Sequence, residues 1–574
     1  MPKEFDIIRA GALLDFNLKY CHSSFELLES KGFNRILNMY LEVSEKNRSI
    51  VYTYLTSIYN EKDLQEVLVS MLKVLSIQEL DDEYPLYKKF IQDTAKFNTF
   101  IDELYSFWLK IERYAIFYYD RNSRSGLAKG ELIIAIDELT NLIIDTRRSI
   151  KKHVSFKVSM VLRQSRSSVN AGISLAKVPW KCPSNYGNIN EIPFIQELVL
   201  MPPFIVYPKM NTRKGTFNET DYNPIENIQL DLNDWFCYPI KVGSYLVFTY
   251  FPRDFMSQGI TLCNLFETAA PTEYENKKPD MVYVYAFNDK DSKLKTDFFH
   301  DKINDIMVGF INKSDDIDYF GYMKKMLLTL HNVKALGNKE LPIHGAMVKI
   351  TLKNGINKNV VIMGDSGAGK SESLEAFRSL TKDYLQKMVI IFDDMGIFKL
   401  NEGKPLAYGT EIGAFVRLDD LDQGYAYKEL DRSIFMNPDK INARVIIPVS
   451  TYEEITAGEP IDYFLYANNY SDSEQAITFF DKIDDALEVF ISGKRMAKGT
   501  TSESGIVESF FANPFGPVQR QEETLTLIDA YFKDMFNKKV KVGMIHTKLG
   551  IPGHEQSGPK NAAKSLFEMI LNEK

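Results

Sequence analysis

The sequence has few cysteines, and none of them has metal-binding spacing. Its four cysteines, Cys21, Cys182, Cys237 and Cys263, are scattered along the chain. Because no two of them form a CxxC pair, the sequence predicts neither a disulfide framework nor a zinc ribbon. This usage is typical of a reducing compartment, and the amino terminus lacks a signal-peptide pattern. We therefore expect a cytoplasmic protein.

An excess of basic charge and long apolar runs are also absent. The 574 residues include 77 acidic and 69 basic side chains. Because general nucleic-acid binding requires a positive field, we expect no nucleic-acid partner. No apolar stretch approaches the length that crosses a bilayer, so we expect no membrane partner either. A chain of this length is typical of roughly two to four domains.

A glycine-rich loop with a defined chemistry is present in the second half. Residues 364–371 match the pattern GxxxxGK[ST] of a phosphate-binding loop. The apolar run 360–363 precedes the loop and the helix-compatible run 372–377 follows it, so strand, loop and helix come in the required order. We expect the loop to bind ATP or another nucleoside triphosphate. Its residues are Gly364, Asp365, Ser366, Gly367, Ala368, Gly369, Lys370 and Ser371.

Each residue type of this loop has a physical role. The glycines at 364, 367 and 369 permit a tight turn, whose amide groups converge on phosphate oxygens at the positive end of the following helix. Lys370 supplies a charge that reaches the β- and γ-phosphates, and the Ser371 hydroxyl can bind a Mg²⁺ ion that bridges them. A chance match in a glycine-containing turn is the alternative interpretation.

A pair of aspartates follows a second apolar run. Residues 388–392 read Met-Val-Ile-Ile-Phe, which is typical of a buried parallel strand, and Asp393 and Asp394 come directly after them. Because ligands of open α/β sheets bind at the carboxyl ends of strands, we expect these carboxylates near the phosphates. Asp393 and Asp394 would then complete the Mg²⁺ shell that Ser371 begins. A solvated pair of acids in a turn is the alternative.

Four segments in the right order together resemble the phosphoenolpyruvate carboxykinases. Residues 320–326 read Phe-Gly-Tyr-Met-Lys-Lys-Met and are similar to the Gly-Glu-Met-Lys-Lys element of that family. His344 falls where the family places its metal-binding histidine, and the phosphate loop follows. Residues 442–448, Asn-Ala-Arg-Val-Ile-Ile-Pro, are similar to the segment Asn-Thr-Arg-Val-x-Tyr-Pro. The wording of the loop also resembles HPr kinase/phosphorylase, a protein-serine kinase with a related catalytic core.

The resemblance covers about residues 315 to 570 and implies a role for each matching residue. Lys325, His344 and Asp394 would bind a second cation such as Mn²⁺, which requires that the pKa of the lysine be lowered. Lys370 would hold the phosphates. Arg444 would stabilise the transferring phosphoryl group, because a planar guanidinium binds its oxygens in pairs. From the residues alone, Lys325 could be a solvated charge, His344 a core histidine and Arg444 a surface ion pair.

Three features of the carboxykinase pattern are missing. Residues 211–215 are only a faint echo of the segment that carries the family's substrate arginine, no lysine lies near Ala414, and Ser504 replaces an arginine. The phosphoryl acceptor therefore stays open. It could be oxaloacetate, as in carboxykinases, or a hydroxyl of a protein or small molecule, as in HPr kinase. A third possibility is a catalytically decayed nucleotide sensor.

The pattern of apolar residues changes twice along the sequence. Residues 1–152 carry apolar side chains three and four apart, which predicts a helical domain, and the aromatic runs 107–109 and 114–119 are expected in its core. This domain could bind a protein partner or a second copy of the chain. Residues 153–295 contain short β-rich runs between prolines, which predict a mixed β lobe that could bind substrate. Residues 296–574 would form a carboxykinase-like P-loop α/β catalytic domain. The expected fold class is multidomain α+β.

Overall fold

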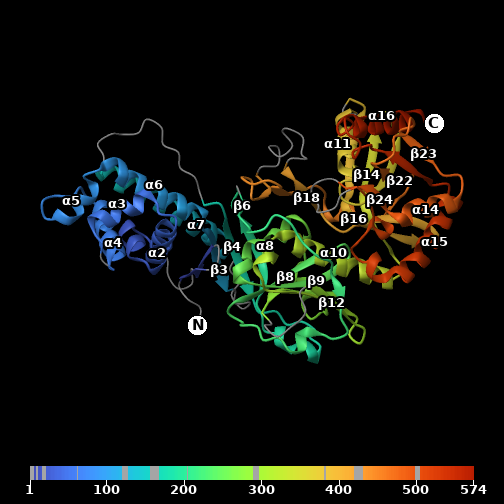
Figure 1. Cartoon of the computed structure of the whole chain (residues 1–574). Coiled ribbons are helices and arrows are strands. Elements are labelled where there is room, and N and C mark those ends of the chain that lie inside the picture. The colour runs from blue at the N-terminus through green and yellow to red at the C-terminus, as the bar shows by residue number, and fades with distance from the viewer. Residues whose placement is uncertain are drawn as a thin grey trace. The chain divides into compact units, whose positions relative to one another are not determined.

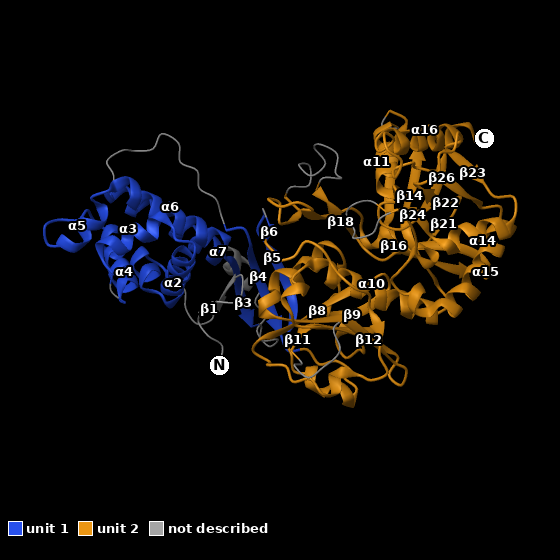
Figure 2. Ribbon diagram, viewed as in Figure 1, with its two compact units in different colours: residues 1–177, 193–206 blue, residues 178–192, 207–574 orange. Residues whose placement is uncertain are grey.

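The computed structural model describes residues 5–7, 11–15, 21–60, 62–118, 127–154, 167–202, 204–288, 296–380, 383–418, 431–497 and 505–573. The chain is a multidomain protein of mixed α and β structure with several mixed sheets (Figure 1). It divides into two compact units, of which unit 1 comprises residues 1–177 and 193–206 and unit 2 comprises residues 178–192 and 207–574 (Figure 2). The expected division into three parts stays a prediction.

Helices make up most of unit 1 up to residue 110. They are α1 (Ser24–Glu29), α2 (Lys31–Lys46), α3 (Ile50–Ile58), α4 (Leu64–Leu75), α5 (Pro85–Ile91) and α6 (Thr94–Lys110), and α7 (Leu127–Val154) follows later. Serine caps begin several of them, since Ser30 accepts a hydrogen bond from the Phe33 amide and Ser49 accepts one from the Tyr52 amide. Their apolar faces meet in a core that includes the fully buried Leu37, Leu55 and Phe97. The helical expectation is confirmed for this part.

A sheet is also present in unit 1, which the sequence pattern did not predict. Its strands are β1 (Phe5–Ile7), β2 (Gly11–Asp15), β3 (Glu112–Tyr118), β4 (Asn170–Ala176) and β5 (Phe194–Leu200), and the short β6 (Phe204–Val206) follows. β2, β3 and β4 are parallel neighbours, whereas β1 and β5 run antiparallel to them. The helical interpretation is therefore wrong at residues 112–118. Their aromatic and β-branched side chains suit a pleated surface.

Unit 2 begins with a mixed sheet that is covered by a long helix. Its strands are β7 (Asn218–Glu219), β8 (Trp235–Val242), β9 (Tyr245–Pro252), β10 (Glu267–Thr268), β11 (Met281–Phe287), β12 (Thr296–Asp301) and β13 (Ile306–Asn312). The helices of this region are α8 (Met256–Thr261), α9 (Pro271–Tyr274) and α10 (Phe320–Gly337). A Cβ at Gly309 would lie 2.8 Å from the Leu330 side chain, so α10 lies directly on β13. The expected β-rich texture is confirmed for this sheet.

The second sheet of unit 2 carries the glycine-rich loop. Its strand order is β21 (Glu459–Pro460), β17 (Lys404–Gly409), β16 (Leu385–Asn401), β14 (Leu341–Leu352), β15 (Asn357–Met363), β22 (Tyr463–Asn468), β26 (Lys541–His546) and β23 (Ile477–Phe479). The helices are α11 (Lys370–Leu380), α13 (Tyr452–Thr456), α14 (Ile483–Ser492), α15 (Gln521–Asn537) and α16 (Ser557–Asn572). The smaller strands are β18 (Gly413–Arg417), β19 (Ile434–Met436), β20 (Arg444–Pro448), β24 (Lys494–Met496) and β25 (Ile506–Glu508).

Helices cover both faces of this second sheet, as Figure 1 shows. Successive strand residues point to opposite faces, so Val360 packs in one core with α11 and α16, while Val361 packs in the other with α14 and α15. The arrangement is a three-layer α/β/α structure with the sheet in the middle. None of the helices in the described ranges combines the length and the apolar character that a bilayer span requires.

The strand that carries the aspartate pair differs from its predicted form. Residues 388–392 lie in β16, as expected for an apolar run, but β16 is antiparallel to both β14 and β17. It also does not end at Asp393 and Asp394, because it continues to Asn401. The register with β14 shifts beside Ile391, which marks a bulge two residues before the aspartates. The parallel-strand prediction is therefore wrong, because an apolar run by itself does not reveal strand direction.

Glu573, the C-cap residue of α16, connects three strands of the second sheet. Glu573 forms ion pairs with Lys358 of β15, at 2.6 Å, and with Lys541 of β26, and it accepts a hydrogen bond from the Tyr463 hydroxyl of β22. These three strands are adjacent. Burial raises the pKa of Glu573, but the hydrogen bonds from Lys358, Lys541 and Tyr463 outweigh it and lower the pKa from 4.5 to about 2.

We expect Glu573→Gln to lower the Tm of unit 2 at pH 7, by about 2–4 °C. The carboxylate has a lower pKa in the folded chain than in the unfolded chain, so its stabilisation is present above pH 4.5 and is lost toward pH 2. Thermal unfolding followed by circular dichroism between pH 7 and pH 3 measures the difference between variant and parent, which should shrink as the pH falls. A difference that is independent of pH would contradict this account.

Candidate functional site

The glycine-rich loop connects β15 to α11, so the predicted order of strand, loop and helix is confirmed. Gly367 and Gly369 have φ angles of 80° and 94°, which favour glycine. A Cβ at Gly369 would lie 2.7 Å from the Thr547 side chain. The same threonine hydroxyl donates to the Ala368 carbonyl at 2.7 Å. Thr547, which follows β26, therefore holds the loop and leaves no room for a side chain at residue 369.

Lys370 is buried at the beginning of α11. Its Nζ donates to the Asp365 carbonyl at 3.1 Å, so the side chain folds over its own loop. The Gly367 carbonyl accepts a hydrogen bond from Asn469 Nδ2 at 2.9 Å. These contacts fix the curvature of the loop while its exposed turn at Ser366 stays accessible. An amine placed in this way can exchange the carbonyl for a phosphate oxygen.

The Asp365 carboxylate is enclosed within the base of the loop. Arg495 Nε lies 3.0 Å from it, the Ser366 amide donates to it at 2.7 Å, and His344 Nδ1 lies 3.5 Å away. Burial raises the pKa of Asp365, but the interactions with His344 and Arg495 outweigh it, and the pKa is below its usual value. Asp365 therefore connects the loop to β24 and β14.

Strand register brings the aspartate pair beside the loop. Met363 at the end of β15 pairs with Gly345 of β14, and Gly345 pairs in turn with Asp394 of β16. The Ser371 hydroxyl donates to Asp393 Oδ1 at 3.0 Å. Burial raises the pKa of Asp393, the Ser371 hydrogen bond lowers it and the charge of Asp394 raises it further, so the pKa is above its usual value. A hydroxyl and a carboxylate at this place are oxygen donors of the type that Mg²⁺ binds.

Asp394 is the centre of a charge cluster. Its Oδ2 lies 2.6 Å from Lys325 Nζ and 2.8 Å from Lys324 Nζ, and its Oδ1 lies 3.0 Å from His344 Nε2. Burial raises the pKa of Asp394, but the two ammonium groups outweigh it and hold the pKa well below its usual value. The φ angle of Asp394 is 145°, a strained value for a residue with a side chain. The surrounding charges maintain this strained geometry.

The chemistry of His344 and Lys325 fits a cation site. His344 is fully buried, and burial followed by the charge of Lys370 lowers its pKa, so the ring is neutral. Its Nδ1 lies 2.7 Å from the Ala512 carbonyl, and its Nε2 lies 3.0 Å from Asp394 Oδ1. Burial also lowers the pKa of Lys325, against the opposing charge of Asp394. An imidazole, a carboxylate and a lysine with a lowered pKa form a donor set suited to a divalent ion.

This donor set is not a conventional metal cluster. Over the described ranges, no group of three or more His, Cys, Asp or Glu side chains is placed to hold a metal ion. The predicted donors form two smaller groups. One is Ser371 with Asp393, and the other is Lys325 with His344 and Asp394. The Mg²⁺ and Mn²⁺ assignments therefore depend on a hydroxyl and an amine as ligands.

A buried ion pair beside this cluster was not predicted. Lys324 Nζ lies 2.9 Å from Glu411 Oε1, and both side chains are 1% exposed. Burial lowers the pKa of Lys324, but Asp394 and Glu411 outweigh it and raise the pKa above its usual range. Burial raises the pKa of Glu411 to about 7, in spite of Lys324. Two adjacent lysines in α10 were the available signal, but the sequence does not reveal which of them faces Glu411.

Arg213 also approaches the site, through the ring of Phe515. Its Cζ lies 5.4 Å from the centre of that ring, Lys325 Nζ lies 4.6 Å from it, and the His344 ring centre is 6.2 Å away. Burial lowers the pKa of Arg213. The segment that the sequence offered only as a faint echo of the substrate-arginine motif is therefore brought next to the predicted metal ligands. Because Arg213 is far from Lys325 and His344 in the sequence, the sequence alone does not reveal that they lie close together in the fold.

Arg444 lies one aromatic ring away from the charge cluster. It begins β20, and its Cζ lies 5.4 Å from the centre of the Phe415 ring, which Lys324 Nζ approaches to 5.7 Å. Its Nε is buried without a hydrogen-bond partner. Ala414, where a lysine is missing, is buried in the neighbouring strand β18. Ser504 lies outside the described residues.

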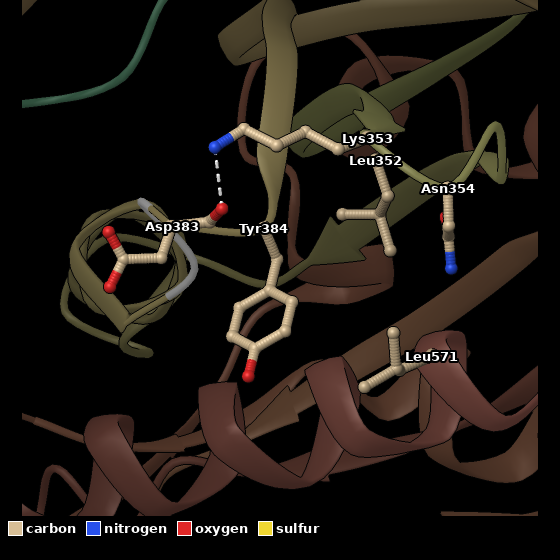
Figure 3. Close-up of a pocket in the computed structure, with 6 residues that line it drawn as sticks. All are labelled: Leu352, Lys353, Asn354, Asp383, Tyr384 and Leu571. Carbon is tan, nitrogen blue, oxygen red and sulfur yellow. Dashed lines mark hydrogen bonds between the residues drawn. The ribbon is translucent and has the colours of Figure 1, made fainter.

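A separate hollow of about 270 Å³ lies at the other end of β14 (Figure 3). Its lining comprises Leu352, Lys353, Asn354, Asp383, Tyr384 and Leu571. Lys353 Nζ donates to the Asp383 carbonyl at 2.6 Å, as the dashed line in Figure 3 marks. The lining includes none of the predicted site residues, so this hollow carries no argument for catalysis.

Comparisons with known proteins add no family assignment. No protein-family model matches the sequence, and a search of curated proteins finds no match.

We expect Lys324→Met to lower the free energy of unfolding by about 3 kcal/mol at pH 8, because it leaves Glu411 buried without its cation. The loss should be smaller at pH 5.5. In the variant Glu411 must bind a proton to stay buried, and this becomes easier as the pH falls toward the unfolded-state pKa of about 4.3. Urea denaturation at both pH values measures the difference.

The matched control is Lys324→Met combined with Glu411→Gln. The double variant has no buried carboxyl to protonate at residue 411, so the pH dependence of the difference from the parent should be weaker. Equal pH dependence in the single and double variants would show that Lys324 and Glu411 do not interact energetically.

Proposed function

We propose that this chain transfers a phosphoryl group from ATP, or another nucleoside triphosphate, to an acceptor with the help of divalent cations. One observation carries the proposal. The two adjacent aspartates separate two sets of donors beside the glycine-rich loop, since Asp393 contacts Ser371 while Asp394 contacts Lys325 and His344. A phosphate loop in an unrelated role would not require this second set.

Nucleotide binding would begin at the loop. The amides at the amino end of α11 point toward the space where phosphates bind in such loops, and the helix dipole adds positive potential there. Lys370 would exchange its hydrogen bond with the Asp365 carbonyl for the β- and γ-phosphates. Thr547 and Asn469 keep the loop curved during this exchange, because they bind its carbonyls from outside.

The donor sets fit two cations. Ser371 and Asp393 would hold Mg²⁺, and His344, Asp394 and Lys325 would hold a second ion such as Mn²⁺. When bound, such ions neutralise charge on the phosphate oxygens and polarise the transferring group. Lys325 would have to lose its proton to become a ligand, and burial lowers its pKa in that direction. Lys324 stays charged and keeps Asp394 and Glu411 in place.

The positively charged side chains near the site would bind the acceptor and the transferring phosphoryl group. Arg444 has a buried Nε without a hydrogen-bond partner, so it could donate to the phosphoryl oxygens. Arg213 and Lys325 share the Phe515 ring, which places two positive groups on one side of the site. A negatively charged acceptor suits this side, and oxaloacetate is such a molecule. The proposed carboxykinase-like reaction would release CO₂ from oxaloacetate and transfer the γ-phosphoryl group of ATP to the enolate oxygen that forms, which gives phosphoenolpyruvate and ADP.

A kinase that phosphorylates a hydroxyl is the second candidate. The sequence of the loop, with its Asp365 and Ser366, resembles HPr kinase/phosphorylase, and Asp365 makes structural contacts to Arg495 and His344. The lysine that carboxykinases carry near Ala414 is also missing. These observations favour a different acceptor with the same donor chemistry.

We expect Lys370→Ala to reduce phosphoryl transfer by about 100-fold or more, because it removes the charge that stabilises the β- and γ-phosphates. Release of ADP and binding of a fluorescent ATP analogue measure the effect. Lys353→Ala is the matched control, since Lys353 is a lysine of the same unit that lines the separate hollow. Equal losses in both variants would sink the assignment of the loop.

The acceptor can be identified by product analysis. With ATP, Mn²⁺ and oxaloacetate, the carboxykinase-like candidate predicts phosphoenolpyruvate, and Lys325→Ala should raise the Mn²⁺ concentration that gives half-maximal rate. No phosphoenolpyruvate at high enzyme concentration, together with Lys370-dependent phosphorylation of a protein or small hydroxyl compound, would favour the kinase. Nucleotide binding without turnover on any acceptor would identify a sensor instead.

A further inference from the structure

A second group of buried polar side chains lies in unit 1, where the sequence contains no recognisable motif. Arg113 is the second residue of β3 and is only 6% exposed. Its Nε and Nη2 are buried and make no hydrogen bond. Burying an ionised guanidinium without a partner is strongly unfavourable, so proteins rarely keep one unless it binds something. Burial lowers the pKa of Arg113 to about 10, which leaves it charged at neutral pH.

Asn170 lies directly beside Arg113. β3 and β4 are parallel, and their register pairs these two residues, so both side chains project from the same face of the sheet. Asn170 is 1% exposed, and neither its amide nitrogen nor its amide oxygen has a hydrogen-bond partner. The hydroxyl of Ser168, two residues earlier, is also buried and unpartnered. Three neighbouring side chains therefore offer donors that the protein itself does not use.

The backbone around these side chains is fixed. The Arg113 amide donates to the Val169 carbonyl at 2.9 Å, and the Ser168 amide donates to the Leu109 carbonyl at 2.9 Å. The Asn170 carbonyl accepts a hydrogen bond from the Met201 amide at 3.0 Å. The unpartnered side chains are thus carried by a well-bonded backbone and not by an irregular loop. Such preorganisation favours ligand binding.

The surroundings of Arg113 are aromatic and positive. Its Cζ lies 5.8 Å from the centre of the Trp108 ring. Burial raises the pKa of Tyr105, against the opposing charges of Arg147, Arg113 and Arg148. Arg147 lies 4.2 Å from the Tyr105 ring and pairs with Asp102.

The carboxylate next to Arg113 in sequence belongs to another contact. Glu112 accepts a hydrogen bond from the Tyr114 hydroxyl at 2.5 Å. Because successive residues of a strand point to opposite faces, Glu112 and Tyr114 lie on the face opposite to Arg113. Within the described ranges no carboxylate forms an ion pair with Arg113, so an anion from solution could neutralise it.

We propose that Arg113, Asn170 and Ser168 form a binding site for a small oxyanion, the phosphate group of a soluble ligand. The guanidinium would donate two parallel hydrogen bonds to the oxyanion, and the Asn170 amide and the Ser168 hydroxyl would donate one each. This site is separate in sequence and in compact unit from the glycine-rich loop. It does not depend on the function proposed for that loop.

The three tryptophans of the chain make the site observable in the full-length protein. They are Trp108, Trp180 and Trp235. Incorporation of 5-fluorotryptophan gives three ¹⁹F resonances, and Trp108→Phe assigns the one beside Arg113. The protein carries Lys370→Ala, so that phosphate binding at the loop is weakened. Inorganic phosphate is added at constant ionic strength, with chloride as the control.

We expect phosphate to move the Trp108 resonance in a saturable way, with a dissociation constant of about 1 mM, and to leave Trp180 and Trp235 unmoved. Arg113→Met should abolish the shift. The absence of any saturable shift of Trp108 up to about 50 mM phosphate, a concentration well above that dissociation constant, would overturn the proposal. A phosphate monoester such as glycerol 3-phosphate that binds more tightly than inorganic phosphate would indicate a larger ligand, and equal affinity would indicate the free ion.

Stability separates this proposal from a purely structural role of Arg113. Without anion, Arg113→Met should keep or raise the Tm of unit 1, because an apolar side chain replaces a buried uncompensated charge. Asn170→Asp should raise the Tm and abolish the phosphate response, because it supplies a carboxylate beside the guanidinium within the chain. If both variants lowered the Tm and the Asn170→Asp protein still responded to phosphate, the site would be refuted.

Discussion

The charge of Asp394 is the interaction on which the rest of the candidate site depends. It receives two ammonium groups from α10 and an imidazole from β14, and it lies on β16. Without this carboxylate, Lys324 and Lys325 would be two like charges side by side in a buried place, which is strongly unfavourable. The helix on one sheet and the two strands of the other are therefore joined by a single side chain.

The strained backbone of Asp394 becomes understandable in this context. A φ angle of 145° is unfavourable for a residue with a side chain, but the surrounding charges fix the carboxylate where it is. The bulge beside Ile391 and the close approach at Gly345, where a Cβ would lie 2.7 Å from the Ile362 carbonyl, bring the aspartate pair near the end of β15. Sheet geometry and electrostatics thus place the same two carboxylates beside the glycine-rich loop.

The sequence predicted the parts of the fold that depend on local chemistry. The strand before the loop and the helix after it follow from apolar pattern and glycine content, and they are confirmed. The direction and length of β16 were mispredicted, because an apolar run is compatible with parallel and antiparallel neighbours alike. The sequence pattern predicts a helix where β3 lies, because aromatic residues pack well in the cores of helical bundles and of sheets alike.

The sequence does not predict which residues far apart in the chain contact one another. Glu411 lies 87 positions from Lys324, and no local pattern distinguishes it from a surface acid. The incomplete motif around Arg213 does not predict a role for this residue, although folding brings it to the Phe515 ring. In both cases the deciding quantity is burial of a charge, which depends on the whole packed unit and not on the neighbouring residues.

Buried guanidinium nitrogens without a hydrogen-bond partner occur in both units. In unit 2 the Nε of Arg444 has no partner, and in unit 1 the guanidinium of Arg113 has none at two of its nitrogens. A folded chain has no stability reason to bury such a group, since an apolar side chain of similar volume would be neutral or better. The cost is offset when an anion from solution occupies the place. The proposed oxyanion site at Arg113 and the proposed phosphoryl contact of Arg444 therefore follow from the same physical argument.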